Sequence, residues 1–590
     1  MKKLFVVALL ATMIASCYED KGNYDYAPMM TFNTNTQGMN VSIPSAQRSS
    51  AFVGELFTAY PAMYFQNVVN PEDTNRLEYY WLKGGANNAI DTVWKGRILN
   101  WTPTATGSTS IFLCVVDPVT GYKFLSIGMQ LTVSSRIGTG WAFLHNYNGQ
   151  TDMSFIRPTQ IQYPDPNDDT KTITERQYVD YMNYLSSVNE EPVGTNPTKF
   201  AYYGTTSSKK IVIFQDNTVS INGDTWVKEL DMTAEFAGTV PAGGFKDLFY
   251  IESGTRALLA NNGQVFLDTD FSSFYTTKFV GMPMIDQETA QDITIDAFPE
   301  SVHHIWHGRI FWAHDAKNKK FYMTVPANQG ITVFDPFTTK EEIVNRPGSF
   351  ASEEYEAAYI DLAGYGDYNY LFSAARTGAM NLSATAGNRY NAQLVFFFEK
   401  DGEIYLQFMT CSKTSYDLDK TQNDMDWRYY AEWSDIKTVK LTDMFQGQYG
   451  GIVATNDMFS KNTPHVFVNG KGQGQYGTGQ KMDVLYFAKG NIVYCMDFET
   501  ESLYEYFKLP EGVNVKLMEL NKHDTELGIY ADDNTFRTLK CSPSNIINTD
   551  FASKEIQVWN NITNVVDLEY FVKSWSDITG NSTSDRIIWE

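Results

Sequence analysis

One unit recurs through the C-terminal part of the chain: an apolar strand, a polar turn and a second apolar strand. It occurs six times, at residues 210–221, 256–267, 309–325, 394–408, 484–497 and 525–540. Turns such as Asn-Gly and Asp-Gly between apolar runs are a strong signal of a β-hairpin. The units are irregularly spaced, which excludes a strict repeat such as the Trp-Asp type. The chain must therefore bury a long series of separate hairpins.

The number of hairpins indicates a propeller. About 450 residues lie between residue 137 and the end of the chain, which is too many for one small sandwich, and radial blades of four strands accommodate them. We therefore predict an all-β chain in which residues 137–590 form a β-propeller-like domain of about seven blades. Two or three separate β-sandwiches are the alternative. One inserted helix is expected near Thr174–Ser187, where apolar and aromatic residues repeat at helical spacing.

The preceding residues, 31–136, predict a smaller Ig-like or PKD-like β-sandwich. Ile111–Val116 is a near-continuous apolar run, as in a strand buried in a sandwich core. A turn that contains Pro118 and Gly121 follows it. Trp81 is the expected core aromatic of this domain.

The first residues predict an export signal. Two lysines precede an apolar stretch, Leu4–Ile14, that is too short to span a bilayer as a stable helix. The sequence Ile-Ala-Ser-Cys that ends at Cys17 resembles the lipobox of bacterial lipoproteins. This resemblance implies that residues 1–16 are a signal peptide, that Cys17 is lipidated, and that residues 17–30 are a lipidated tether. An ordinary signal peptide with a chance cysteine is the alternative.

The tether also carries a localisation signal. Glu19 and Asp20 follow Cys17 closely and resemble the surface-export signal of Bacteroidota lipoproteins. The resemblance implies a lipid-anchored protein of the outer membrane that faces the cell exterior. A charged, solvated tether without such a signal is the alternative.

Four segments resemble the PKD-like lipoproteins of Bacteroidota. They are CYEDKGNYDY, LEYYWLKGG, GSTSIFLCVVDPVTGYKF and GWAFLHNYNGQTDMSFI, all within residues 17–156. The Trp-Asp-Phe-Gly-Asp-Gly signature of true PKD domains is absent, so the resemblance implies a fold and no ligand. Members of this family resemble accessory lipoproteins of Sus-type outer-membrane uptake systems, which implies an importer complex as a partner.

Composition excludes some function classes. The chain has 46 Lys and Arg against 69 Asp and Glu, a formal net charge of −23. Binding to nucleic acid needs clustered Lys and Arg, so we expect no nucleic-acid partner. The five cysteines contain no CxxC pair, and no structural disulfide framework is expected.

A histidine cluster is the one candidate metal site. Four of the seven histidines fall within twelve residues, and the even separation of His303 and His307 would place them on one face of a strand. Zinc or copper needs three or four such ligands that converge. Aromatic residues alternate with these histidines, as they do in an ordinary blade strand. We therefore favour a structural role and expect no cofactor.

An aromatic cluster is the candidate ligand site. Trp and Tyr rings stack on sugars or hold peptide side chains, and packing in a blade core is the favoured alternative. The cluster consists of Trp427, Tyr429, Tyr430 and Trp433.

Two further motifs match known binding patterns only in part and predict no site. Gly472, Gly474 and Gly477 spell GxGxxG, but they lie in a Gly- and Gln-rich run that predicts a loop. The stretch that starts at Asp165 has calcium-loop spacing but lacks the glycine and glutamate of an EF-hand.

Function follows from these observations only at a coarse level. No GxSxG, HExxH or Walker A motif occurs. We expect a non-catalytic binding or accessory subunit of an outer-membrane uptake system for a glycan or a peptide. A propeller hydrolase or lyase is one alternative, and a structural adaptor that docks on the importer is another.

The lipobox yields the first prediction. Cys17→Ala removes the thiol that would carry the lipid, so the protein should leave the membrane fraction and lose palmitate labelling. Fractionation after labelling measures both. An unlabelled variant that stays with the membrane would refute the lipoprotein assignment.

Overall fold

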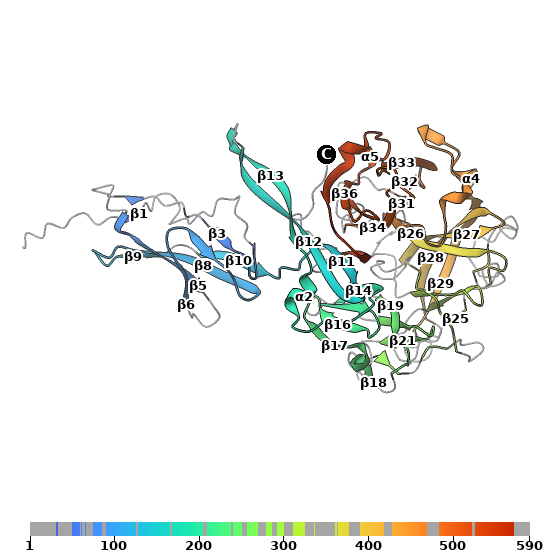
Figure 1. Cartoon of the computed structure of the whole chain (residues 1–590), viewed down its shortest axis with the longest axis horizontal. Coiled ribbons are helices and arrows are strands. Elements are labelled where there is room, and N and C mark those ends of the chain that lie inside the picture. Colours follow the sequence, from blue (N-terminus) through green and yellow to red (C-terminus); the bar gives the residue numbers. More distant parts are fainter. Residues whose placement is uncertain are drawn as a thin grey trace, which may run out of the picture. The chain divides into compact units, whose positions relative to one another are not determined.

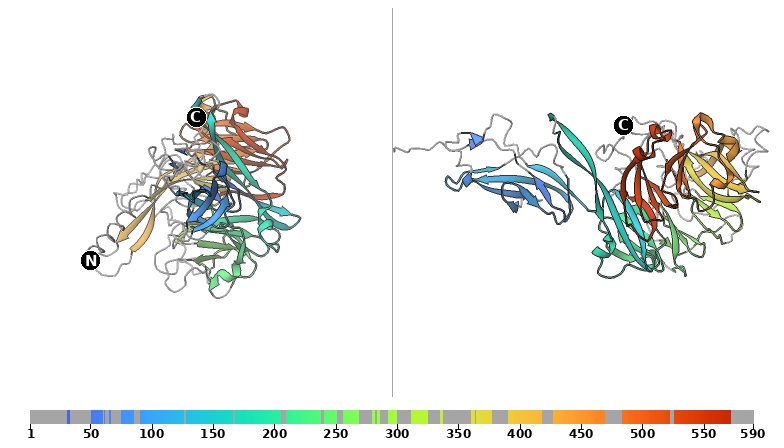
Figure 2. Two further views of the ribbon diagram at one scale, coloured as in Figure 1. Left: turned by 90° about the vertical axis from the view of Figure 1, so that its left-hand side faces the viewer. Right: turned by 45° about the horizontal axis from the view of Figure 1, so that its top comes forward.

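The structure, a computed structural model, is built almost entirely of strands (Figures 1 and 2). It describes the chain from Thr31 to Phe571 with internal gaps. The residues outside this description are 1–30, 33–49, 60, 62–64, 67–74, 85–89, 126–127, 166–167, 205–208, 238–239, 251–255, 269–278, 282, 286–291, 300–310, 325–334, 337–359, 363, 377–389, 418–426, 469–482, 522–524 and 572–590.

The chain divides into two compact units. The smaller contains Met1–Arg136 and Gln160–Arg176, and the larger contains Ile137–Thr159 and Gln177–Glu590. Each is described by itself. No helix within the described residues is long and apolar enough to cross a membrane.

The smaller unit has one large sheet and two short ones. In the order of pairing, its strands are β2 (Ser50–Phe52), β10 (Met129–Ser134), β8 (Gly107–Val116), β5 (Glu78–Gly84) and β6 (Ile90–Lys95), with β9 (Lys123–Leu125) beside β8, then the pairs β3 (Phe57–Ala59) with β7 (Leu99–Trp101) and β1 (Thr31–Phe32) with β4 (Phe65–Gln66).

The large sheet and the β3–β7 pair share one core, which confirms the predicted sandwich. Phe57 and Leu99 of the short pair pack with Leu113 and Leu131 of the large sheet. Trp81, the expected core aromatic, is fully buried, and its Nε1–H donates to the Gly96 carbonyl at 3.1 Å. The single polar atom of this buried ring is therefore hydrogen-bonded, as burial requires.

Seven sheets of three or four antiparallel strands, which we number as blades 1 to 7, make up the larger unit, except that residues 160–176 of the first sheet belong to the smaller unit. In the order of pairing, blade 1 is β13 (Asp168–Tyr181), β12 (Gln150–Asp165), β11 (Gly140–Tyr147) and β38 (Val565–Phe571), and blade 2 is β14 (Lys199–Gly204), β15 (Lys209–Phe214), β16 (Val219–Asn222) and β17 (Lys228–Asp231). Blade 3 is β19 (Phe245–Tyr250), β20 (Arg256–Ala260) and β21 (Val265–Asp268), blade 4 is β23 (Phe311–Asp315), β24 (Lys320–Thr324) and β25 (Asp335–Pro336), and blade 5 is β26 (Asn369–Arg376), β27 (Tyr390–Lys400), β28 (Glu403–Asp417) and β29 (Trp427–Lys440). Blade 6 is β30 (His465–Phe467), β31 (Val484–Lys489), β32 (Ile492–Asp497) and β33 (Ser502–Lys508), and blade 7 is β34 (Val515–Leu520), β35 (Glu526–Ala531), β36 (Phe536–Lys540) and β37 (Glu555–Trp559).

Shorter elements connect the blades. They are α2 (Tyr184–Val188), η3 (Met232–Glu235), the parallel pair β18 (Phe236–Ala237) and β22 (Phe279–Val280), α4 (Leu441–Met444), η6 (Gln448–Gly450), η7 (Asn456–Met458), α5 (Pro543–Ile546) and α6 (Phe551–Lys554).

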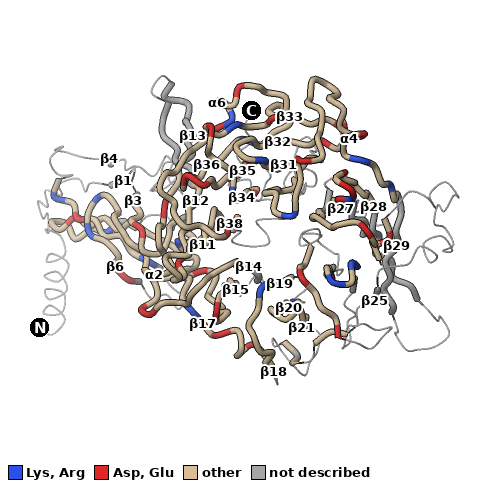
Figure 3. The backbone as a smooth tube through the Cα atoms, turned by 45° about the vertical axis from the view of Figure 1, so that its right-hand side comes forward, with Lys and Arg blue, Asp and Glu red and all other residues tan. Residues whose placement is uncertain are grey.

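The blades form a ring that the last strand closes. The first strands of neighbouring blades contact one another, β14 with β19, β26 with β30, and β30 with β34. Blade 1 takes its innermost strand from the C-terminal end of the description: β38 pairs with β11 and contacts both β14 and β34. Figure 3 shows β38, β14, β19 and β34 around one centre. The all-β fold with a seven-bladed propeller is confirmed.

The two faces of β38 pack into different cores. Leu568 packs with Trp141 and Phe536 at the junction of blades 1 and 7. Phe571 packs with Phe200 in blade 2, where the two rings stack with centroids 6.0 Å apart. Buried aromatic side chains contribute large apolar areas, so the closing strand is held from both sides.

The prediction of an inserted helix near Thr174–Ser187 is wrong over most of its length. Strand β13 continues to Tyr181, and only Tyr184–Val188 is helical. Thr, Tyr and Val are frequent before the turn, and these residues favour strands. Asn183 then takes a φ of 52°, which turns the chain between the strand and the helix.

A glycine at the ring closure gives the second prediction. A Cβ on Gly528 would lie 2.6 Å from the Trp141 ring, so Gly528→Ala should lower the free energy of unfolding by about 1–3 kcal/mol. Gly364→Ala is the matched control, since nothing lies within 4 Å of its Cβ position. Urea denaturation of both variants measures the difference, and equal stabilities would contradict the tight junction.

Candidate functional site at the inner strands of the propeller

Charged side chains gather on the innermost strands of blades 1 to 3. Lys199 begins β14, and its Nζ lies 2.8 Å from Asp247 Oδ1 on β19. Asp567 on β38 accepts the backbone N–H of Phe200 through Oδ2 at 2.9 Å. An innermost strand has one edge without a partner in its own sheet, so its N–H groups need other acceptors. Asp567 satisfies one of them and thereby joins blades 1 and 2.

The two aspartates occupy equivalent places. Asp247 and Asp567 are each the third residue of their strand, and each accepts the N–H of the following leucine, at 2.9 and 3.1 Å. A β-bulge precedes each aspartate and leaves Lys246 and Val566 without a cross-strand partner. Bulges re-aim side chains, and they are frequent next to functional sites.

Ionisation in this group follows from burial and neighbouring charges. Burial alone would lower the pKa of Lys199, but the carboxylates of Asp247, Asp567 and Glu569 raise it above its ordinary value. Burial raises the pKa of Asp567 above 3.8, although the charge of Lys199 opposes this. The Lys199 side chain is 42% exposed, so solvent and ligands can reach the group.

A second group lies where the chain enters blade 4. Asp296 precedes Ala297, which bridges to His314 of β23. Asp296 Oδ1 lies 2.7 Å from His314 Nδ1, and His314 Nε2 lies 2.8 Å from the Tyr365 hydroxyl. Burial opposes ionisation of Asp296, but the hydrogen bond and charge of His314 prevail and lower its pKa. The contact with His314, which Tyr365 holds in turn, fixes the carboxylate in position.

Two lysines from distant blades flank Asp296. Lys461, which precedes blade 6, places its Nζ 3.7 Å from Asp296 Oδ2. Lys246 donates from its Nζ to the Ile295 carbonyl at 3.5 Å. Burial lowers the pKa of Lys246, and the nearby charge of Lys461 acts in the same direction. The inner strands and the segments that lead into blades 4 and 6 therefore carry a mixed set of ammonium and carboxylate groups.

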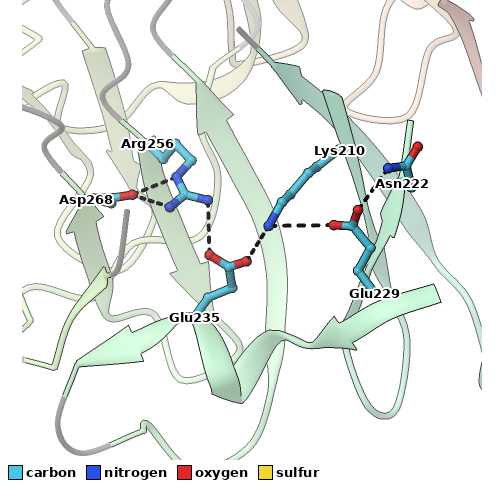
Figure 4. Close-up of polar contacts among 6 residues, drawn as sticks. All are labelled: Lys210, Asn222, Glu229, Glu235, Arg256 and Asp268. Atoms are coloured by element: carbon cyan, nitrogen blue, oxygen red, sulfur yellow. Dashed lines mark hydrogen bonds and ion pairs between the residues drawn. The ribbon is translucent and has the colours of Figure 1, made fainter. Parts of the chain in front are cut away.

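A separate polar network joins blades 2 and 3 away from these groups (Figure 4). Glu235 of η3 lies between two cations: its Oε1 is 2.8 Å from Lys210 Nζ, and its Oε2 is 3.4 Å from Arg256 Nη1. Arg256 also donates to Asp268 from Nε at 2.8 Å. Glu235, Arg256 and Asp268 are buried, so this network is a structural connection between blades.

The sequence-predicted site residues have different outcomes. Cys17, His303 and His307 lie outside the described residues. Trp427, Tyr429, Tyr430 and Trp433 lie in β29, opposite Asp417, Ser415, Thr414 and Cys411 of β28, and their side chains lie outside the description. Within the described residues, no group of three or more His, Cys, Asp or Glu is placed to hold a metal. The aromatic site and the role of the histidines stay predictions.

The charged inner strands were missed by the sequence analysis. Their residues lie far apart in the chain, and each strand carries only one or two charges among apolar and aromatic residues. One signal was present: Asp-Leu-x-Tyr occurs at residues 247–250 and again at 567–570. The innermost strands of blades 3 and 1 carry these two copies.

The family resemblance is supported by a match of the N-terminal part of the chain. Residues 17–197 match the PKD-like family. The resemblance is thus confirmed over these residues. The match includes the sandwich and continues through β11, β12 and β13 of blade 1. No curated protein matches the chain.

Several solved structures are similar to the chain at low identity. A quinonprotein alcohol dehydrogenase-like protein from Bacteroides thetaiotaomicron has 10% identity and a TM-score of 0.32, with 90% of this chain and 95% of that chain covered. A protein of unknown function from the same organism has 10% identity and a TM-score of 0.24, with coverages of 85% and 96%. The β-propeller domain of Cps50 (Swd1) from Myceliophteria thermophila has 8% identity and a TM-score of 0.26, with coverages of 59% and 98%.

The network between blades 2 and 3 gives the third prediction. Glu235→Gln leaves Lys210 and the 7%-exposed Arg256 with one carboxylate fewer, so the free energy of unfolding should fall by about 3 kcal/mol. Asp457→Asn is the matched control, because Asp457 and Lys489 form a pair whose side chains are 73% and 42% exposed. That change should leave the free energy of unfolding almost unchanged, because an exposed ion pair contributes little. Similar losses of unfolding free energy in both variants, measured in urea, would show that the buried network stabilises the protein no more than an exposed pair does.

Asp567 gives the fourth prediction, which concerns pH. Its pKa in the folded protein lies above 3.8, so the folded state binds the proton more tightly than the unfolded state does. The stability of the wild type relative to Asp567→Asn should therefore fall as pH rises from 3.8 through the folded-state pKa, and then level off. Urea denaturation across this range measures the difference in stability between the wild type and the variant. A difference that is constant with pH would contradict the burial of this carboxyl.

Proposed function

We propose that this chain is a cell-surface lipoprotein that acts as a non-catalytic binding or accessory subunit of an outer-membrane nutrient-uptake system. The observation that carries the proposal is the accessible set of charged side chains on the inner strands of a closed ring. The lipobox at Cys17 supports the proposed lipid anchor. The match of residues 17–197 to the PKD-like family supports the proposed relationship to accessory lipoproteins. A glycan or a peptide is the ligand class.

The ionisation of the inner groups suits binding better than proton transfer. General acid–base catalysis needs a group that changes protonation near the working pH. The pKa of Lys199 is raised and that of Asp296 is lowered, so both groups stay charged at neutral pH. Fixed charges of this kind orient hydroxyl, carboxylate and amide groups of a ligand.

One observation favours the alternative of a propeller hydrolase or lyase. A carboxyl whose pKa is raised by burial can act as a general acid, and Asp567 has a raised pKa. However, both of its oxygens already accept backbone N–H groups, from Phe200 and Leu568. This bonding fixes Asp567 as a structural acceptor, and binding remains the preferred function.

The test combines binding with turnover. The full chain with Cys17→Ala is titrated calorimetrically with a panel of oligosaccharides and peptides, and each bound ligand is analysed afterwards by chromatography. We expect at least one ligand to bind and to be recovered intact, and the double variant Lys199→Met, Asp247→Asn to weaken it without a change of net charge. Recovery of cleaved ligand would favour the enzyme. Absence of any binding would remove the binding function.

A further inference from the structure

Two ammonium groups at the inner strands have little protein bonding of their own. Lys246 Nζ makes one hydrogen bond within the described residues, a long one of 3.5 Å to the Ile295 carbonyl. Lys461 Nζ has a single contact there, at 3.7 Å from Asp296, and its side chain is 65% exposed. Lys199 differs, because Asp247 binds it at 2.8 Å. Lys246 and Lys461 are therefore available to a ligand, whereas Lys199 is already paired.

The carboxylate of Asp296, which lies near both lysines, is held in a fixed position. Asp296 Oδ1 lies 2.7 Å from His314 Nδ1 and accepts the backbone N–H of Ala316 at 2.8 Å. Tyr365 holds His314 from its other nitrogen. Asp296 thus stays in place and attracts both ammonium groups without saturating either. A mobile anion could complete their bonding.

The strand that carries Lys246 also presents acceptors. Asp247 is the next residue, and its Oδ2 makes no hydrogen bond within the described residues. Asp567 and the partly exposed Glu569 lie close enough to Lys199 to raise its pKa. Anion donors and hydroxyl acceptors are therefore both present at the inner strands.

We propose that Lys246 and Lys461 bind the carboxylate of an acidic sugar, while the neighbouring carboxylates accept its hydroxyl groups. This inference rests on the proposed function, namely that the propeller binds a ligand at its inner strands. A sugar acid carries one carboxylate and several hydroxyl donors in a single ring, which matches this mixture of groups. An acidic peptide matches it less well, because its acidic side chains offer no hydroxyl donors to the carboxylates of Asp247 and Asp567.

The experiment compares acids with their own neutral esters. Galacturonate and glucuronate oligomers and their methyl esters are titrated into the full chain with Cys17→Ala, with an acidic peptide as a third arm. The acid should bind about tenfold more tightly than its ester, since a hydrogen bond to a charged group contributes about that much. Its affinity should also fall as salt rises, because salt screens exposed charges.

Variants then assign the effect to the two lysines. Lys246→Met and Lys461→Met should each weaken the acid about tenfold and leave the ester unchanged, and Lys246→Arg and Lys461→Arg should retain acid binding. Lys489→Met, which removes a partly exposed cation outside this group, is the control. Circular dichroism checks that each variant folds.

The outcomes separate this inference from the proposed function. Equal affinity for acid and ester, or acid binding that survives both methionine variants, would overturn the inference and leave the binding function in place. Tighter binding of the acidic peptide than of any sugar acid would overturn the sugar assignment. Failure of the acids, the esters and the wider panel to bind would overturn both.

Discussion

The pairing of β38 with β11 is the interaction on which the propeller depends. These strands are joined by backbone hydrogen bonds over a register that runs from Gly140 opposite Phe571 to His145 opposite Val565. Parts of the chain more than 400 residues apart are thereby placed in one sheet. Without that sheet, blades 2 and 7 would each lose a neighbour and expose apolar faces to water. The closure places β38 beside β14 of blade 2 and β34 of blade 7, and so converts an open row of blades into a ring.

The candidate site depends on the same closure. Asp567 belongs to the closing strand, and it reaches Phe200 in the next blade only when β38 is in place. Its equivalent in blade 3, Asp247, holds Lys199 from the other side. The inner-strand charges are therefore assembled from strands at opposite ends of the propeller sequence. A ligand at these groups would stabilise the closed ring, because it would bind the folded state alone.

The sequence predicted the middle of each blade better than its edges. Four of the six predicted hairpins are the central pairs of blades 2, 5, 6 and 7, such as β15–β16 and β31–β32, and the other two lie in the three-stranded blades 3 and 4. Central strands are buried on both faces, so they appear as continuous apolar runs; the neighbours Tyr486 and Phe487, for example, point to opposite faces and are both fully buried. Inner strands such as β30 are short and carry polar residues, and their pattern is weaker. The helix expected over Thr174–Ser187 failed because aromatic residues that fit a helical spacing also favour strands.

The site was less predictable than the fold. A charged residue in one strand gives no indication of which strand will lie beside it, and Lys199, Asp247 and Asp567 meet only through the ring. The repeated Asp-Leu-x-Tyr was the one local indication. By contrast, the aromatic and histidine clusters were conspicuous because their members are close in sequence, which says little about whether they converge on a ligand.

Native-state hydrogen exchange of β38 tests the closed ring most directly. If β38 closes the propeller, its amides should exchange only through the same global opening that exposes the central strand β31, with an equal free energy of opening. The amides of β11 that face β38 should exchange with the same free energy of opening as those of β38. Exchange of the β38 amides at a much lower free energy, while β31 stays protected, would show that the ring stands without its closing strand and would contradict this account.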